Sequence, residues 1–365
     1  MMTTPQQHIH YHPRFTYEKQ ISVLLSVCRL FGLFPVDNYY NFSKFWYTIS
    51  ILLNLLIFFL LLFILYWKLV FLVIVRSKHD HTRNIVLLGK LFDELSIIVI
   101  HLYNCYNYIS IWKQLILYKT KLNLQNVLIK SNIITIFTIV YFLFEILIYQ
   151  IVYKFLINNT NIFTVLFSII NVFYKFSNTM ILYQFSMYIE LLTQHIINLK
   201  NQLNIERIQS TQNLIALTIE HNQLIEQGYH INCIYSKSIF ISCTSTFVQI
   251  LFGGYLIMLK VVCNDHDLSF YGINEAAHGL VKILLLAYVC ENFHGNAEQF
   301  NVKLHNLLKK YEHYRNEQLI FYCLKDRNEN FMAGGFIKLG YPFIASVLAT
   351  VVTYEIVIFQ FTPCK

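Results

Sequence analysis

Long apolar runs separated by polar segments dominate the chain. Seven of them have about the length, roughly 20 residues, at which a helix crosses a bilayer. They cover residues 45–67, 86–108, 132–156, 162–188, 238–259, 272–293 and 339–361. This pattern predicts an all-α polytopic membrane protein with seven transmembrane helices.

Two long connections, 190–237 and 294–338, also carry apolar residues at roughly helical spacing, with charged and amide side chains between them. We expect cytosolic helices there that prolong the fourth and sixth spans. Such helices would form an anchor region for contacts between subunits. Solvated helices without a partner are the alternative.

Composition agrees with a membrane protein and argues against a nucleic-acid partner. The 365 residues are 56% hydrophobic and 13% charged, whereas a soluble domain carries about 25% charged residues. The net charge of +8 comes from Lys and Arg in short loops between apolar runs. The tendency of basic residues to stay on the cytoplasmic side explains that charge better than nucleic-acid binding does.

The loop charges also predict an orientation. With the N-terminus in the cytosol, the inner segments hold most of the Lys and Arg residues, although the first outer loop argues against this. The sequon at Asn158 then lies outside and is a glycosylation candidate, and the one at Asn41 lies inside. The predicted organisation is a cytosolic segment 1–44, transmembrane helices 1–6 over 45–293, a cytosolic connection and anchor helix over 294–338, a pore-lining helix over 339–361 and an extracellular tail 362–365.

The seventh run carries a polar stripe on one side of the predicted helix. At about 100° per residue, five positions fall within an arc of roughly 80°. They are Ser346, Thr350, Thr353, Val357 and Gln360. Glu355 points nearly the opposite way. In a membrane, such a stripe packs against another helix or faces water.

Several spans contain charged or polar residues, which are costly in a bilayer and therefore face the interior of the helix bundle. Glu275, His278 and Lys282 share one face of the sixth span. The other candidates are Glu145, Tyr149, Tyr174, Lys175, Gln249 and Tyr255. These residues either form interhelical pairs, such as Glu145 with Lys175, or line a water-accessible pocket for a small polar ligand.

Three segments resemble insect gustatory receptors. Thr353-Tyr354, five mostly apolar residues and Gln360-Phe361 are similar to the motif that closes that family. The segments Leu30-Phe31-Gly32-Leu33-Phe34-Pro35 and Phe331-Met332-Ala333-Gly334-Gly335-Phe336 resemble the family's motifs before its first and last spans. The matches lie near both ends of the chain, and the middle agrees in layout.

The resemblance implies a taste receptor subunit of a ligand-gated, non-selective cation channel. It implies four subunits, identical or mixed, in the plasma membrane of chemosensory neurons, opened by a small extracellular tastant. By the same resemblance Gln360 and Phe361 line the gate, and Thr353 and Val357 line the pore below it. Some sugar-sensing members carry an acid at the position of Glu355, which bears on the class of ligand. Because Glu355 points away from the predicted pore, it is also a candidate for coupling the pocket to the pore helix. The ligand, a sugar or a bitter compound, stays open.

Other functions fit the sequence less well. A receptor coupled to G proteins would have the opposite orientation, and a transporter would commonly show internal repeats or broken helices. No protease, hydrolase or paired-aspartate motif is present, so we expect no enzyme and no cofactor. The eight cysteines form no metal-ligand pattern. Cys263 and Cys364 would both lie outside in the predicted topology, and whether they form a disulfide stays open. An odorant-receptor-like channel subunit is the nearest alternative.

Overall fold

A computed structural model of the chain describes residues 162–203, 210–263, 269–311, 314, 316–324 and 330–360, together with scattered helical positions between 44 and 66. Side chains in these ranges are described except at 162–178, 259–263 and 269–271. Five helices and one hairpin make up the continuous part: α5 (Ile162–Gln202), α6 (Thr211–Cys263), α7 (Ser269–Lys310), α8 (Glu317–Leu324), β1 (Met332–Ala333), β2 (Ile337–Lys338) and α9 (Tyr341–Gln360).

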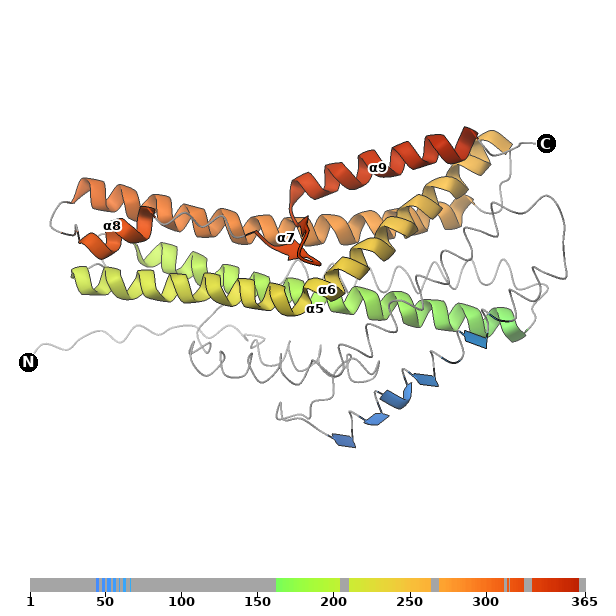
Figure 1. Cartoon of the computed structure of the whole chain (residues 1–365), viewed down its shortest axis with the longest axis horizontal. Helices are drawn as coiled ribbons and strands as arrows, with labels where there is room; N and C mark the ends of the chain where they lie inside the picture. Colours follow the sequence, from blue (N-terminus) through green and yellow to red (C-terminus); the bar gives the residue numbers. More distant parts are fainter. Residues whose placement is uncertain are drawn as a thin grey trace, which may run out of the picture.

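The three longest helices lie side by side along the long axis of the molecule (Figure 1). The short helix α8 lies at one end of them, and α9 runs beside the other half of α6 and α7 (Figure 1). The hairpin lies near the middle, directly before α9 (Figure 1). The described helices therefore form an elongated bundle, and α9 lies beside only one part of it (Figure 1).

Helix length separates α9 from the others. α5, α6 and α7 have 41, 53 and 42 residues, about twice the length that a bilayer requires. α9 has 20 residues, which matches that length. By length and composition, three described helices could cross a membrane: α6 over Thr211–Met258, α7 over Gly272–Lys310 and α9. The fold is thus helical and of the membrane-protein class, as the apolar runs predicted.

Side-chain caps fix the starts of two helices. The Ser210 Oγ accepts a hydrogen bond from the Asn213 N–H at 3.3 Å at the start of α6. The Asn316 Oδ1 accepts one from the Gln318 N–H at 2.9 Å at the start of α8. Ser and Asn are among the preferred N-cap residues because their oxygens satisfy N–H groups that have no partner within the helix.

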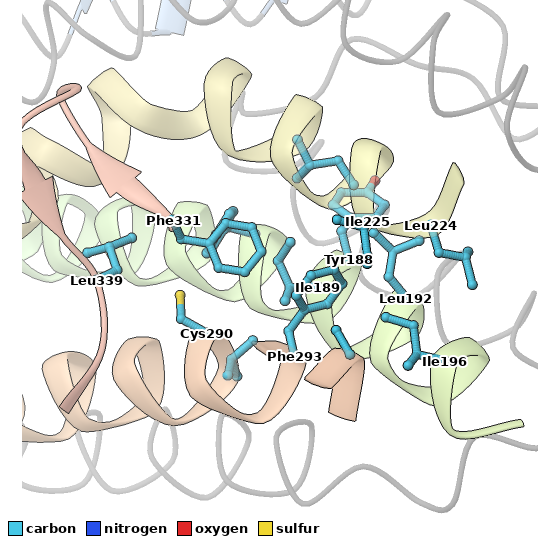
Figure 2. Close-up of a cluster of buried hydrophobic side chains, with 14 of the residues drawn as sticks. Tyr188, Ile189, Leu192, Ile196, Leu224, Ile225, Cys290, Phe293, Phe331 and Leu339 are labelled. Carbon is cyan, nitrogen blue, oxygen red and sulfur yellow. The ribbon is translucent and has the colours of Figure 1, made fainter. Parts of the chain in front are cut away.

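One apolar core runs between α5, α6 and α7. Its fully buried side chains include Ile189, Ile196, Leu224 and Phe293. Phe331 and Leu339 enter the core from the hairpin region (Figure 2). The core extends into the parts of α5 and α7 beyond the predicted spans, where Leu199 and Leu304 are also buried. Tertiary packing therefore stabilises these helical extensions, as it does most protein helices.

Polar contacts join the same extensions. The Lys200 Nζ donates to Asn296 Oδ1 at 2.9 Å and to Gln299 Oε1 at 2.7 Å. The Lys303 Nζ donates to the Lys200 carbonyl at 2.8 Å. Burial lowers the pKa of Lys200, and the nearby charge of Lys303 lowers it further. These bonds connect α5 with α7 near the end of the bundle that carries α8 (Figure 1).

The hairpin docks on the middle of α6. Met332 pairs with Lys338 and Ala333 with Ile337, and the turn needs Gly334 and Gly335 at φ values of 64° and 85°. The Ser236 Oγ donates to the Met332 carbonyl at 2.9 Å, and the Gly334 N–H donates to the Ser236 carbonyl at 3.0 Å. The hairpin is therefore held to a fixed point of α6 immediately before α9 begins.

Candidate functional site

α9 has one buried face and one exposed face. Val347, Val351 and Glu355 are its buried residues, at a spacing of four. The two valines pack with Ile250 of α6 and Ile283 of α7, and the Tyr354 ring meets Phe247 of α6 with centroids 6.3 Å apart. This side attaches the helix to the rest of the chain.

The polar stripe lies on the exposed face. Ser346, Thr350, Thr353, Val357 and Gln360 are all exposed in the single chain. Each of the three hydroxyls donates to its own helix: Ser346 to the Pro342 carbonyl at 3.1 Å, Thr350 to Ser346 at 2.7 Å and Thr353 to Ala349 at 2.8 Å. Because the hydrogens are used inside the helix, the oxygens keep lone pairs for partners outside it.

Large apolar side chains flank this stripe on the exposed surface of α9. Val352 and Ile356 are 57% and 53% exposed, and Phe359 is 44% exposed. A single chain in water would not leave such a surface uncovered, because exposed apolar patches mark contacts with lipid or protein. The exposed face therefore combines hydrogen-bond acceptors with a surface suited to lipid or to another subunit.

Glu355 occupies a close contact with α6. Its carboxylate lies against the backbone at Gly254 and Tyr255, and neither oxygen has a hydrogen bond of regular geometry within the described part of the chain. A Cβ added at residue 254 would lie 2.5 Å from Glu355 Oε1. Glycine at this position is therefore what lets a carboxylate from α9 approach α6.

Glycines also bring α6 and α7 into backbone contact. A Cβ at Gly253 would lie 2.5 Å from the Gly272 carbonyl and 2.6 Å from the Ala276 nitrogen. A Cβ at Gly279 would meet the Ile250 side chain and the Thr246 carbonyl. The contact between Glu355 and α6 therefore lies one residue from the place where α6 touches α7.

The charged face of α7 is buried between its neighbours. Glu275, His278 and Lys282 are 0%, 2% and 4% exposed. The His278 Nε2 lies 3.4 Å from the Thr179 Oγ1 of α5. On α6, Thr246 and Gln249 are buried too, and Thr246 Oγ1 and Gln249 Oε1 have no hydrogen-bond partner within the described residues. The three helices thus enclose several polar groups in an otherwise apolar region.

The other predicted site residues are placed as follows. Tyr255 is 6% exposed on α6. Tyr174 and Lys175 belong to α5, in the part whose side chains are not described. Glu145, Tyr149, Asn158 and Phe361 lie outside the described residues, and so does the expected pair of Glu145 with Lys175. Over the residues described, His, Cys, Asp and Glu form no group of three that could hold a metal ion.

Two features near α9 were not predicted from the sequence. One is the hairpin, although Gly334-Gly335 between short apolar segments is a turn signal. The other is the contact of the Glu291 carboxylate on α7 with the start of α9, where Tyr341 N–H donates to Glu291 Oε1 at 3.2 Å. That contact joins residues fifty positions apart, and local sequence carries no signal for it.

The fold and the arrangement of α9 define a helical membrane protein, and comparison with known families specifies its class. The family model described as 7tm Chemosensory receptor matches residues 21–363. The chain therefore belongs to the 7tm chemosensory receptor family. No curated protein matches the chain in a sequence comparison.

Solved structures agree in fold. The chain is similar to the insect olfactory receptor OR5 from Machilis hrabei, with a TM-score of 0.59 and 13% identity over 94% of this chain and 97% of that one. The structure of the same receptor in complex with eugenol gives a TM-score of 0.54 and 14% identity over 94% and 98% of the two chains. At this identity the likeness describes the fold and not the ligand.

Proposed function

We propose that the chain is a gustatory receptor subunit. Four such subunits would form a ligand-gated, non-selective cation channel whose pore is lined by α9. The observation that carries the proposal is the exposed polar stripe on α9. Its outward lone pairs suit hydrated cations, and one helix alone cannot enclose water. Four copies of α9 around an axis would enclose a path lined by Thr353, Val357 and Gln360, with Phe361 at the outer end.

The gustatory assignment rests on the closing motif of the sequence, Thr353-Tyr354 and Gln360-Phe361. An odorant-receptor-like subunit is the second candidate, because the two similar structures reported above are of an insect olfactory receptor. In either case the chain would lie in the plasma membrane of a chemosensory neuron, with its N-terminus in the cytosol and Asn158 glycosylated outside.

The stimulus would be a small molecule bound among the spans from outside. Glu275, His278, Lys282, Gln249 and Tyr255 supply buried hydrogen-bonding groups on α6 and α7. A sugar suits these groups, whereas an aromatic ligand suits the 16% aromatic content. Eugenol, an aromatic phenol bound by the similar receptor, is therefore a useful probe beside sucrose.

The pore assignment is tested by cysteine accessibility under patch clamp. Thr353→Cys and Val357→Cys should react with a charged thiol reagent from the bath, and the reaction should block current more rapidly when the channel is open. Val347→Cys, on the buried face of the same helix, is the matched control and should stay unreactive. Equal protection of all three cysteines would remove α9 from the pore.

Glu355 would couple the ligand to the pore. Its carboxylate touches α6 at Gly254, and the adjacent Gly253 touches Gly272 and Ala276, which flank Glu275 on α7. Movement of α7 would therefore reach α9 through two close contacts. We expect Glu355→Gln to shift the concentration for half-maximal current about fivefold upward. Normal activation of that variant would show that the coupling runs elsewhere.

A further inference from the structure

α9 begins without a capping side chain of its own. α6 and α8 are capped by Ser210 and Asn316. α9 instead follows Gly340, which has no side chain, and its second residue, Pro342, has no N–H. The N–H of Tyr341 must therefore find an acceptor from another part of the chain, or from water.

Glu291 of α7 supplies that acceptor. The Tyr341 N–H donates to Glu291 Oε1 at 3.2 Å, and a carboxylate near a helix start is favoured by the helix dipole. Gly340 is part of the arrangement, because a Cβ there would overlap the same oxygen. Glu291 lies between Cys290 and Phe293, both fully buried, so its backbone is held firmly by the core.

The contact joins α9 to a different helix than the hairpin does. The hairpin is bonded to Ser236 of α6, whereas Glu291 belongs to α7. The same helix carries Glu275, His278 and Lys282 on its buried face nearer the other end. A displacement of α7 at that face would therefore move the residue that holds the start of α9.

We infer that Glu291 is a positioning residue for α9: its carboxylate caps the helix from α7 and transmits movement of α7 to the start of α9. The inference rests on the proposed function insofar as it takes α9 to line the pore. The contact itself does not depend on that function, so the two are tested by separate measurements.

Hydrogen exchange tests the contact on the purified full-length chain. In Glu291→Ala, the peptide that contains residues 339–346 should exchange about fivefold faster than in the wild type, the ratio that loss of a typical cap implies. Glu291→Gln keeps an acceptor oxygen and should fall between the two. Glu298→Ala, an exposed glutamate of the same helix, should leave the peptide unchanged. Equal exchange in wild type and Glu291→Ala would overturn the inference.

Patch clamp tests the transmission, with sucrose and eugenol as the applied probes. Glu291→Ala should raise the half-maximal concentration about fivefold at normal surface expression and unchanged reversal potential, and Glu298→Ala should not. Unchanged activation of Glu291→Ala in a channel that conducts as wild type would overturn the transmitting role. If the wild type passes no current with either probe, the proposed function fails for these probes, and hydrogen exchange alone then decides the contact.

Discussion

Phe331 joins the three long helices through one ring. Its centroid lies 6.1 Å from that of Phe185 on α5, 5.6 Å from Tyr229 on α6 and 5.2 Å from Phe293 on α7. The ring is fully buried, and tilted or edge-on contacts of this kind are favourable beyond area alone. Since Phe331 comes directly before the hairpin, it fixes the segment that leads to α9.

Replacing Phe331 should therefore destabilise the whole bundle. We expect Phe331→Ala to cost about 3–5 kcal/mol, as for large aromatic truncations in a core, and to lower the melting temperature in detergent by fluorescence-detected unfolding. Phe63→Ala removes the same ring at a site that is 52% exposed and should change the melting temperature little. Equal effects would contradict the central role of Phe331.

The buried His195 of α5 should make stability depend on pH. Burial lowers the pKa of this imidazole below its ordinary value, and its Nε2 has no hydrogen-bond partner among the described residues. The unfolded chain takes up the proton at about pH 6.5, before the folded chain does. The contribution of His195 to stability should therefore fall as the pH decreases through that value and stay constant above it.

The matching experiment compares melting temperatures at about pH 7.5 and about pH 5.5. His195→Gln cannot take up a proton and should lose less stability in acid than the wild type. His305→Gln, at an exposed position of α7, should keep the wild-type difference. A wild-type slope that survives in His195→Gln would assign the pH dependence to other groups.

At the scale of elements, the length and periodicity of the last apolar run predicted the helix α9 and its exposed face. They did not predict which residues of other helices contact α9. The last apolar run, 339–361, contains α9 at Tyr341–Gln360, and the arc of polar positions is the face that stays exposed. The partners of that helix, Gly254 and Glu291, depend on long-range packing that no local pattern encodes. The first three predicted spans lie mostly outside the described residues.

Two glycines with equally open surroundings should respond oppositely to alanine. A Cβ at Gly295 in α7 or at Gly335 in the hairpin would meet no atom within 4 Å. Gly295 lies inside a helix, where Ala is better than Gly by about 0.5–1 kcal/mol. Gly335 has a φ of 85°, which costs an L-residue roughly 1–2 kcal/mol.

We therefore expect Gly295→Ala to raise the melting temperature of the purified chain and Gly335→Ala to lower it. The pair isolates backbone conformation, because neither substitution introduces a steric overlap. A loss of stability in both variants would mean that Gly295 has a packing role that its surroundings in a single chain do not reveal.

At the scale of the whole molecule, the exposed apolar surfaces of α8 and α9 favour contacts with other subunits or with lipid. α8 buries Leu319 at 1% exposure but leaves Ile320, Phe321 and Leu324 at 41%, 73% and 75%. α8 itself packs on the bundle, with the Tyr322 hydroxyl bonded to His221. The exposed faces of α8 and α9 belong to one C-terminal segment, which fits an assembly whose central parts are formed by the end of the chain.

Disrupting the exposed face of α8 should therefore break the proposed assembly without unfolding the subunit. If the chain forms the proposed tetramer, we expect Phe321→Asp combined with Leu324→Asp to convert it to smaller species by native mass spectrometry in detergent, because charges in an apolar contact are strongly unfavourable. Val302→Asp is the control, because Val302 is an apolar side chain of α7 that is 52% exposed. Phe300, two residues earlier, stacks on His221, which also contacts Tyr322 of α8. Val302 therefore lies on the side of α7 that faces away from α8. A double variant that stays tetrameric would show that the contact between subunits lies elsewhere. A monomeric wild type would contradict the proposed pore, because one copy of α9 cannot enclose a path for ions.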